Sequence, residues 1–254
     1  MADRQLTGRR ALVTGGSRGI GRAVATRLAE AGAEVSIIAR DPAGVERALA
    51  EGVAQAGLAA DVCDEAALRA AIAQLAGQRP FDLVIANAGG AETARFERTD
   101  AALFRRMFEL NLIATAVTFQ AALPAMRTGG FGRLVAVAST AAHRGYRNTS
   151  AYAAAKHAVL GLVRSLALEV AGSGVTVNAV SPGFTDTDLI GKAATAMAAR
   201  GTVTEAEAKV GFAADNPAGR LITPREVAEA VLYLCGDAAG AVNGQSLLIN
   251  GGEF

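Results

Sequence analysis

The sequence predicts an α/β fold built on one doubly wound parallel sheet of about seven strands, with helices on both faces. Apolar runs of strand length alternate with amphipathic segments of helix length from one end of the chain to the other. The runs LVIAN at 83–87 and LVAVAS at 134–139 lack polar alternation, which is typical of strands that are buried on both faces. No repeat of fixed period, linker or low-complexity tail is found, so residues 1–254 are expected to form one domain.

The same patterns give approximate bounds for each element. We expect helices at 19–31, 43–55, 64–77, 99–127, 150–172 and 224–236. Asp41-Pro42 and Thr223-Pro224 each place a capping side chain before a proline at the first helical position. The expected strands are Ala11–Thr14, Val35–Ala39, a weaker Leu58–Ala60, Leu83–Asn87, Leu134–Ser139, Val175–Val180 and Ser246–Ile249.

Residues 185–215 interrupt this alternation, because they contain helical pieces but no strand pattern. A long insertion in a compact domain is usually a lid or a binding loop. We expect a substrate lid here, and the alternative is a surface helical excursion with no role.

Composition excludes several classes of function. The 25 basic and 24 acidic residues nearly cancel, which argues against nucleic acid or an anionic membrane as partner. The amino-terminal MADRQLTGRR has no apolar signal region, and no stretch reaches the roughly 18 apolar residues of a membrane span. We therefore expect a cytoplasmic protein. Cys63 and Cys235 are interpreted as buried, reduced thiols, and no metal site is expected.

A glycine-rich loop, GGSRGIG at 15–21, follows the first expected strand and opens a helix. Glycines allow a tight turn and a close approach of backbone N–H groups to a pyrophosphate. The helix amino terminus adds free donors and a favourable dipole. The spacing differs from the usual G-x-G-x-x-G pattern and lacks a G-K-S/T ending, which disfavours a nucleoside triphosphate hydrolase.

The motif Thr14-Gly15-x3-Gly19-Ile20-Gly21 resembles the cofactor motif of classical short-chain dehydrogenases/reductases, which have a Rossmann-type fold. Further motifs continue the resemblance in the family's order over nearly the whole chain: Asn87-Ala88-Gly89, Asn111, Ser139, Tyr152-x3-Lys156, Pro182-Gly183 and Asn250-Gly251-Gly252.

The resemblance implies a set of residues that hold a nicotinamide dinucleotide. Asp61 and Val62 would contact the adenine. The alternative for Asp61, of equal weight, is a cap of the next helix, and the alternative for Thr187 is a loop cap. Thr185 departs from the aliphatic residue of many relatives. An ordinary strand-ending turn is the alternative for 87–89. The implied residues are Gly15, Ser17, Arg18, Gly19, Ile20, Gly21, Asn87, Ala88, Gly89, Tyr152, Lys156, Pro182, Gly183, Thr185 and Thr187.

Two arginines indicate which nicotinamide cofactor is used. An acidic residue after the second strand of a Rossmann unit binds the ribose of NAD, whereas an arginine pairs with the phosphate of NADP. Ala39 stands at the acidic position here, Arg40 follows it, and Arg18 lies in the glycine loop. We therefore expect NADP(H). Two solvated arginines are the alternative, and Asp41 would select NAD if it did not cap a helix.

Tyr152 and Lys156 are four residues apart on one expected helix, so they share a face. A nearby ammonium favours the phenolate, which would tune the phenol toward a general acid or base. Ser139 can hydrogen-bond the substrate oxygen and stabilise developing charge. Asn111 resembles the family's fourth catalytic residue, which holds a water that links Lys156 to solvent. The alternative for Asn111 is a structural asparagine in a helix kink.

The substrate is expected to border His143, Tyr146 and Phe184, with a surface loop histidine as the alternative for His143. SPGFTDTDLI and GRLITPREVAEAVLYLC resemble 3-oxoacyl-thioester reductases and polyketide ketoreductases. Arg127 and Arg133 are candidates for docking an acyl carrier, but Ser173 stands where such reductases carry arginine. A coenzyme A thioester or a free ketone therefore stays open as substrate.

Three functions remain in view. The first is an NADP(H)-dependent reductase of a small ketone or 3-oxoacyl thioester, with Tyr152 as general acid. The second is an NAD-dependent secondary-alcohol or 3-hydroxyacyl-CoA dehydrogenase that works oxidatively. The third is a non-catalytic dinucleotide sensor, which would have no need of the four catalytic side chains together. The resemblance also implies a homotetramer, paired through the helices 99–127 and 150–172.

Overall fold

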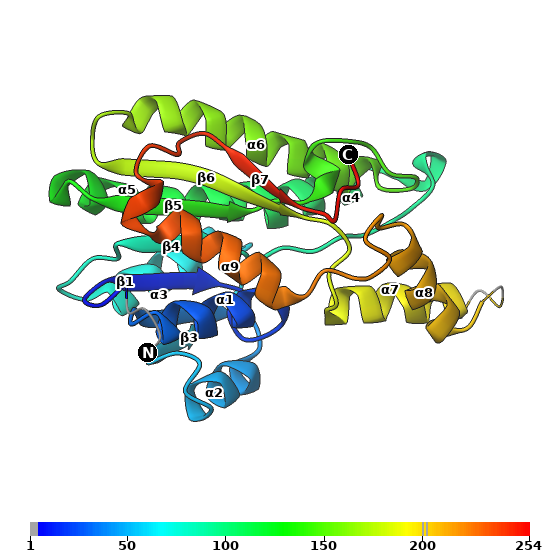
Figure 1. Cartoon of the computed structure of the whole chain (residues 1–254), viewed down its shortest axis with the longest axis horizontal. Coiled ribbons are helices and arrows are strands. Elements are labelled where there is room, and N and C mark those ends of the chain that lie inside the picture. The colour runs from blue at the N-terminus through cyan, green and yellow to red at the C-terminus, as the bar shows by residue number, and fades with distance from the viewer. Residues whose placement is uncertain (1–4, 200, 202) are drawn as a thin grey trace.

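Seven parallel strands form one sheet in the computed structural model, which describes residues 5–199, 201 and 203–254. The strand order is β3-β2-β1-β4-β5-β6-β7, so the direction of winding reverses between β1 and β4 (Figure 1). A sheet of this kind opens a ligand crevice at the carboxyl ends of its strands beside the reversal. The strands are β1 (Arg10–Thr14), β2 (Glu34–Ala39), β3 (Ala56–Ala59), β4 (Leu83–Ala86), β5 (Gly132–Val137), β6 (Val175–Pro182) and β7 (Ser246–Ile249).

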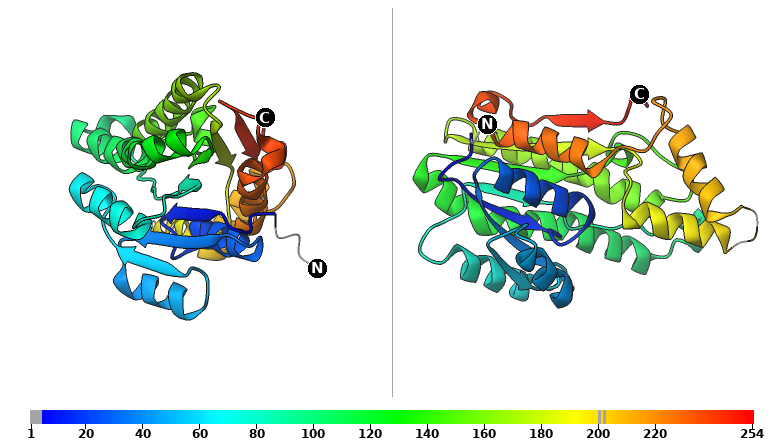
Figure 2. Two further views of the ribbon diagram at one scale, coloured as in Figure 1. Left: turned by 90° about the vertical axis from the view of Figure 1, so that its left-hand side faces the viewer. Right: turned by 60° about the horizontal axis from the view of Figure 1, so that its bottom comes forward.

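Helices cover both faces of the sheet (Figure 2). Alternate residues along each strand point to opposite sides, so Val13 and Ile37 pack under one helical layer and Leu12 and Ile38 under the other. This double burial confirms the expectation drawn from the apolar runs. The first layer contains α1 (Gly19–Glu30), α2 (Pro42–Ala50) and α9 (Pro224–Cys235), and the second contains α3 (Glu65–Ala76), α5 (Ala114–Gly129) and α6 (Ser150–Val170).

The prediction of one regular α-helix at 99–127 is wrong, because a π-helical turn divides the segment into two α-helices. The segment begins as α4 (Ala101–Phe108), passes through a π-helical turn at Glu109–Ile113, and continues as α5. Asn111 lies in this turn, and its side-chain amide donates to the carbonyls of Met107 and Gly90, both at 3.0 Å. These bonds explain the local widening of the helix, because the amide binds a loop outside the helix as well as the preceding turn.

Both expected helix caps are confirmed. The Asp41 carboxylate accepts a hydrogen bond from the Gly44 N–H at 3.1 Å, and the Thr223 hydroxyl accepts one from the Glu226 N–H at 3.2 Å. The helix that Asp41 caps ends at Ala50, earlier than expected, and the chain then turns at Gly52 with φ of 70°. The two helix starts are therefore fixed locally by the residues that the sequence displays there.

The thiol prediction is half wrong. Cys235 is buried, but Cys63 is exposed, because it lies in a turn beyond the end of β3 and not in the core. Asp61 holds this turn by accepting a hydrogen bond from the Cys63 N–H at 3.0 Å.

Two short helices, α7 (Asp188–Ala198) and α8 (Glu205–Ala214), form most of the segment expected to be a lid. They pack on each other and extend at one end of the molecule (Figure 1 and the right-hand view of Figure 2). The Thr185–Ile222 bridge closes the base of the excursion.

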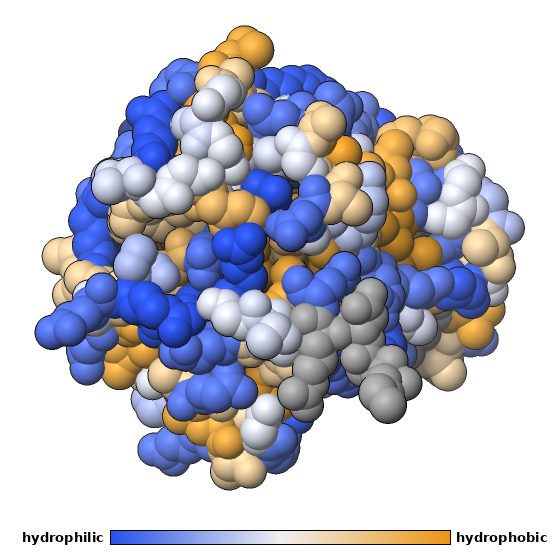
Figure 3. Space-filling view, turned by 60° about the vertical axis from the view of Figure 1, so that its left-hand side comes forward, coloured by the Kyte–Doolittle hydropathy of each residue, from blue (hydrophilic) through white to orange (hydrophobic). Residues whose placement is uncertain are grey.

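None of the helices within the described residues is both long and apolar enough to cross a membrane. On the face drawn in Figure 3, hydrophobic and hydrophilic side chains are interspersed.

Candidate active site

The glycine loop between β1 and α1 is shaped to approach a bound group closely. Gly15 and Gly19 have φ of 67° and 53°, a region that favours glycine. A Cβ on Gly21 would lie 2.2 Å from the Gly15 carbonyl oxygen, so a side chain has no room there. No side chain of the described residues caps the first turn of α1, which leaves its N–H donors free for an anion. These features fit the pyrophosphate of a dinucleotide.

Asn87 and Ala88 connect this loop to the end of β4. The Thr14 hydroxyl accepts hydrogen bonds from the N–H groups of both residues at 3.1 Å. The Asn87 amide donates to the Thr14 and Gly15 carbonyls at 2.9 and 3.2 Å. Asn87 therefore braces the glycine loop, a role that a simple strand-ending turn does not have.

Thr187 closes the loop from the opposite side. A Cβ on Gly19 would lie 3.5 Å from the Thr187 methyl carbon, so the two residues are neighbours although they are far apart in sequence. Thr187 stands at the N-cap position of α7 without a capping side-chain bond to that helix. Its hydroxyl donates to the Thr185 carbonyl at 3.2 Å, and the Thr185 hydroxyl donates to the Gly183 carbonyl at 3.0 Å.

Pro182 and Gly183 lie where the sheet ends beside β7. Pro182 is the last residue of β6, and the Gly183 N–H donates to the Ile249 carbonyl at 3.0 Å. A Cβ on Gly183 would lie 3.3 Å from a carboxylate oxygen of Glu253. The turn is thus held by the carboxyl terminus of the chain.

The end of β2 presents the residues that were expected to choose the cofactor. Arg40 follows β2 directly, Arg18 lies in the glycine loop, and both are exposed. Arg18 forms a 3.6 Å ion pair with Asp188. Ser17 faces the start of α2, since a Cβ on Gly44 would lie 3.2 Å from its hydroxyl. Because the Asp41 carboxylate is used as a helix cap, this edge offers guanidinium groups to a phosphate.

Beyond β3, the alternative role for Asp61 is wrong. The cap of α3 is Asp64, whose carboxylate accepts from the Ala67 N–H at 3.0 Å. Asp61 instead binds the Cys63 N–H, and Val62 beside it is buried against the core.

The four side chains expected to do the chemistry converge at the carboxyl ends of β4 and β5. The Lys156 ammonium donates to the Val137 carbonyl at 2.9 Å and lies 5.9 Å from the centre of the Tyr152 ring. Ser139 follows β5; its hydroxyl accepts a hydrogen bond from the Ala141 N–H at 3.1 Å and lies close enough to the Tyr152 hydroxyl to affect its pKa. The Asn111 amide oxygen and the Lys156 ammonium lie on the same side of Gly89, 2.9 and 3.5 Å from where its Cβ would be. Asn111 therefore combines the helix distortion with a place beside Lys156.

Burial is the main cause of the pKa shifts of Tyr152 and Lys156. It raises the pKa of Tyr152 above its ordinary value, and the Ser139 hydroxyl opposes this increase. Burial also lowers the pKa of Lys156 from 10.5 to about 8. The expected lowering of the Tyr152 pKa by Lys156 is thus not found in the chain alone.

Lys156→Met is expected to stabilise the fold. The fall of the Lys156 pKa from 10.5 to about 8 corresponds to about 3 kcal/mol. Removing the bond to Val137 costs about 1 kcal/mol, which leaves a gain of about 2 kcal/mol at pH 7. Because the folded pKa lies below the unfolded value, the penalty is complete below pH 8 and disappears as the pH rises to 10.5. Urea unfolding at several pH values measures this gain, and an equal difference at pH 7 and pH 10.5 would contradict the explanation.

Two of the three residues expected to border the substrate, Tyr146 and Phe184, form an aromatic wall with Phe212. The Tyr146 and Phe184 rings meet edge to face at 6.1 Å, and Phe184 lies 5.1 Å from Phe212 of α8. Aromatic packing therefore joins the segment before α6 to the helical excursion.

Glu253 is a residue of this wall that sequence reasoning missed. Its nearly buried carboxylate accepts a hydrogen bond from the Tyr146 hydroxyl and lies 3.7 Å from Arg144. Burial and the bond to Glu253 raise the pKa of Tyr146 to about 12. Its position next to the carboxyl terminus gave no sequence signal of a role.

His143 is not the exposed loop histidine considered as an alternative. Its Nε2 lies 3.1 Å from the hydroxyls of Ser181 and Ser246, on β6 and β7. Burial lowers its pKa. Its ring is thereby fixed between the strand ends and the Phe254 ring, 6.1 Å away.

The chain is similar in sequence to known proteins over nearly its whole length. A family model described as enoyl-(acyl carrier protein) reductase matches residues 15–253. Cis-4-hydroxycyclohexanecarboxylate dehydrogenase of Sinomonas cyclohexanicum is 39% identical over 247 residues, with 95% of each chain covered. The 3-oxoacyl-(acyl-carrier-protein) reductase of Escherichia coli K12 is 34% identical, with 97% of this chain and 98% of that enzyme covered.

A solved structure from Beutenbergia cavernae extends the likeness to the fold. That protein is assigned as an NAD(P)-dependent gluconate 5-dehydrogenase and contains NADP at low occupancy. It is 39% identical, covers 99% of this chain and 98% of its own, and superposes with a TM-score of 0.86. The chain therefore belongs to the short-chain dehydrogenase/reductase family, whose members are oxidoreductases acting on CH–OH and C=O groups.

Proposed function

We propose that the chain is an NADP(H)-dependent oxidoreductase that reduces a ketone or a 3-oxoacyl thioester to the alcohol. The convergence of Asn111, Ser139, Tyr152 and Lys156 beside the glycine loop carries this proposal. When bound, the nicotinamide supplies the hydride.

Each of the four side chains has a distinct task in this proposal. The Tyr152 hydroxyl donates its proton to the carbonyl oxygen of the substrate, and the Ser139 hydroxyl binds the same oxygen while charge develops. Lys156 returns a proton toward Tyr152, which the lowered pKa of its buried ammonium favours. Asn111 binds both the N–H and the carbonyl of Gly90, which holds in place the backbone that passes beside the Lys156 ammonium.

The cofactor preference rests on Arg18 and Arg40. We expect Arg40→Asp to weaken NADPH binding by about a hundredfold and NADH binding by less than about threefold. Only NADPH carries the additional phosphate on the adenosine ribose, which a guanidinium would bind in charge-assisted contacts. Fluorescence titration of both cofactors measures the change. Arg47→Asp, in the neighbouring helix, is the matched control for charge reversal. Equal losses for the two cofactors in Arg40→Asp would contradict the assignment.

The surroundings of Arg133 argue against a role for this residue in docking an acyl carrier protein. Arg133, considered above for docking an acyl carrier, is buried, donates to the Gly132 and Gly174 carbonyls at 2.9 and 3.2 Å, and stacks on the Phe131 ring. It has no free face for an acidic partner, so that docking hypothesis is wrong for Arg133. The other candidate, Arg127, is exposed and donates to the Glu169 carbonyl at 2.7 Å. We propose a coenzyme A thioester or a free ketone as the substrate, because Ser173 stands where the reductases that use an acyl carrier have an arginine.

Two further features belong to the proposal. The excursion α7–α8 acts as the substrate lid, supported by the Phe184–Phe212 contact. The enzyme is a homotetramer, supported by Leu168 on α6, which is 80% exposed in the single chain. Light scattering that gives the mass of a monomer would reject the tetramer.

The opposite direction is a second candidate. The same side chains serve alcohol oxidation, with Tyr152 accepting the proton, and the relative from Sinomonas is named a dehydrogenase. NADPH oxidation with a panel of ketones and 3-oxoacyl thioesters, compared with NAD⁺ reduction by the matching alcohols, tests both. A clear excess of the second reaction would overturn the proposed direction and cofactor.

A further inference from the structure

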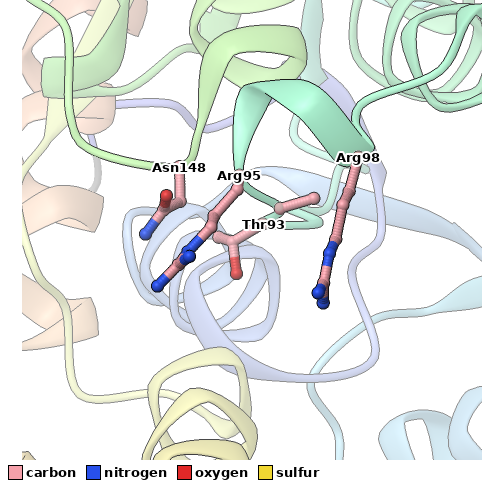
Figure 4. A pocket seen from close by; sticks show the side chains of 5 residues that line it. Thr93, Arg95, Arg98 and Asn148 are labelled. Atoms are coloured by element: carbon pink, nitrogen blue, oxygen red, sulfur yellow. The ribbon is translucent and has the colours of Figure 1, made fainter.

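A pocket with an unassigned role lies next to the proposed active site. It has a volume of about 520 Å³ and is lined by Thr93, Ala94, Arg95, Arg98 and Asn148. Figure 4 shows the Arg95, Thr93 and Arg98 side chains extending in the same general direction, with Thr93 between the two guanidinium groups. Asn148 lies beside Arg95. The sequence motifs did not point to this segment.

One lining residue, Ala94, connects the pocket to the apolar cluster on which the Tyr152 ring packs. Ala94 packs in the small apolar cluster that contains the Tyr152 ring, Ala151 and Met107. The Ala94 N–H donates to the Asn148 carbonyl at 2.9 Å, which joins the segment after β4 to the segment before α6. Asn148 has φ of 64°, a backbone conformation that asparagine tolerates better than most residues. The pocket wall is therefore fixed to the helix that carries Tyr152.

The local backbone brings the two arginines to one side. Arg95 precedes a 3₁₀ turn at Phe96–Arg98, and this type of turn has three residues per repeat. Residues 95 and 98 are three positions apart, which is one repeat of this turn. This is why two guanidinium groups from one short segment reach the same pocket.

The two arginines are also not neutralised. Among the described residues, neither forms an ion pair with a carboxylate, although nearby Arg106 pairs with Glu92 at 3.0 Å. Both side chains are exposed. The chain has a net charge of only +1, so this pair is a local concentration of positive charge. Guanidinium groups with an adjacent hydroxyl are donors that match a carboxylate or phosphate.

We propose that this pocket binds an anionic group of the substrate, at a distance from the carbonyl that reacts at Tyr152. The substrate class is then an oxo acid, or a thioester whose carrier is phosphorylated. The inference rests on the proposed function, because it takes Tyr152 as the reacting end of the site. Its ligand chemistry is a carboxylate or phosphate oxygen anion, and the experiment separates the two sources.

The test is a binding measurement that needs no turnover. The full chain, with and without saturating NADPH, is titrated calorimetrically with cyclohexanecarboxylate and cyclohexanecarboxamide, and with 4′-phosphopantetheine and pantetheine. Each pair differs in charge. We expect the anionic member of one pair to bind about tenfold more tightly, and we expect Arg95→Gln/Arg98→Gln to abolish that preference. A preference within the first pair identifies a carboxylate, and a preference within the second identifies a phosphate.

Two control variants make the result specific. Arg105→Gln removes an exposed arginine of α4 outside the pocket and is expected to keep the preference. Arg95→Lys/Arg98→Lys keeps the charge and is expected to restore part of it. No preference in either pair, or the same preference in the double glutamine variant, would overturn the proposal. Turnover of cyclohexanone, which carries no charge, reports on the proposed function separately.

Discussion

Replacing Tyr152 with phenylalanine is expected to lower turnover by about a thousandfold or more while NADPH affinity stays within about twofold. The substitution removes only the hydroxyl, which supplies the proton in the proposed reaction. The ring keeps its packing against Leu103, Met107 and Ala155, so the fold and the cofactor site are preserved. Steady-state NADPH oxidation with the best ketone and fluorescence titration of NADPH measure the two quantities.

The control for this variant is Tyr233→Phe, which removes a phenolic hydroxyl from the exposed face of α9. We expect it to leave both turnover and affinity unchanged. Ser139→Ala should show a smaller loss of turnover than Tyr152→Phe, because an oxygen-binding donor is lost while the proton donor remains. Turnover retained in Tyr152→Phe would contradict the general-acid role.

Gly21→Ala is expected to lower NADPH affinity by about a hundredfold or more and to destabilise the fold by about 1–3 kcal/mol. The new Cβ would lie 2.2 Å from the Gly15 carbonyl oxygen and 2.3 Å from the Asn87 amide nitrogen. Both atoms belong to the brace between the glycine loop and β4, so the loop must move to admit a methyl group. Cofactor titration and urea unfolding measure the two losses.

Gly211→Ala is the matched control, because Gly211 also lies inside a helix but a Cβ there would meet nothing within 4 Å. Removing a glycine from a helix interior stabilises it by up to about 1 kcal/mol. We expect this variant to gain stability and to bind NADPH normally. A Gly21→Ala protein with unchanged NADPH affinity would show that the loop does not approach the cofactor.

Sequence reasoning succeeded where local patterns decide the structure. All seven strands were expected within a few residues, because buried runs and their turns are local signals. The caps at Asp41 and Thr223 depend only on neighbouring residues. The π-helical turn within the expected helix 99–127 is accompanied by a hydrogen bond from Asn111 to Gly90, a residue 21 positions away. No helical pattern in the sequence reveals such a contact.

The candidate site divides in the same way. The family motifs named Asn111, Ser139, Tyr152 and Lys156, and the fold brings these residues together. The chain's termini and loops were less predictable. Glu253 reaches Tyr146 only through the path of the last strand, and Arg95 and Arg98 share a pocket only because a 3₁₀ turn aligns them. The pKa of Tyr152 depends on burial, which spacing on a helix does not report.

The most direct test of the central claim follows the hydride itself. The full chain is incubated with NADPH deuterated at the transferring position and with a panel of ketones and 3-oxoacyl thioesters, and the products are analysed by mass spectrometry. The account predicts an alcohol that carries the deuterium on the former carbonyl carbon, formed in equal amount to the NADPH consumed. It also predicts that Tyr152→Phe forms almost none. Absence of deuterated product from every compound, or equal transfer from deuterated NADH, would contradict the account.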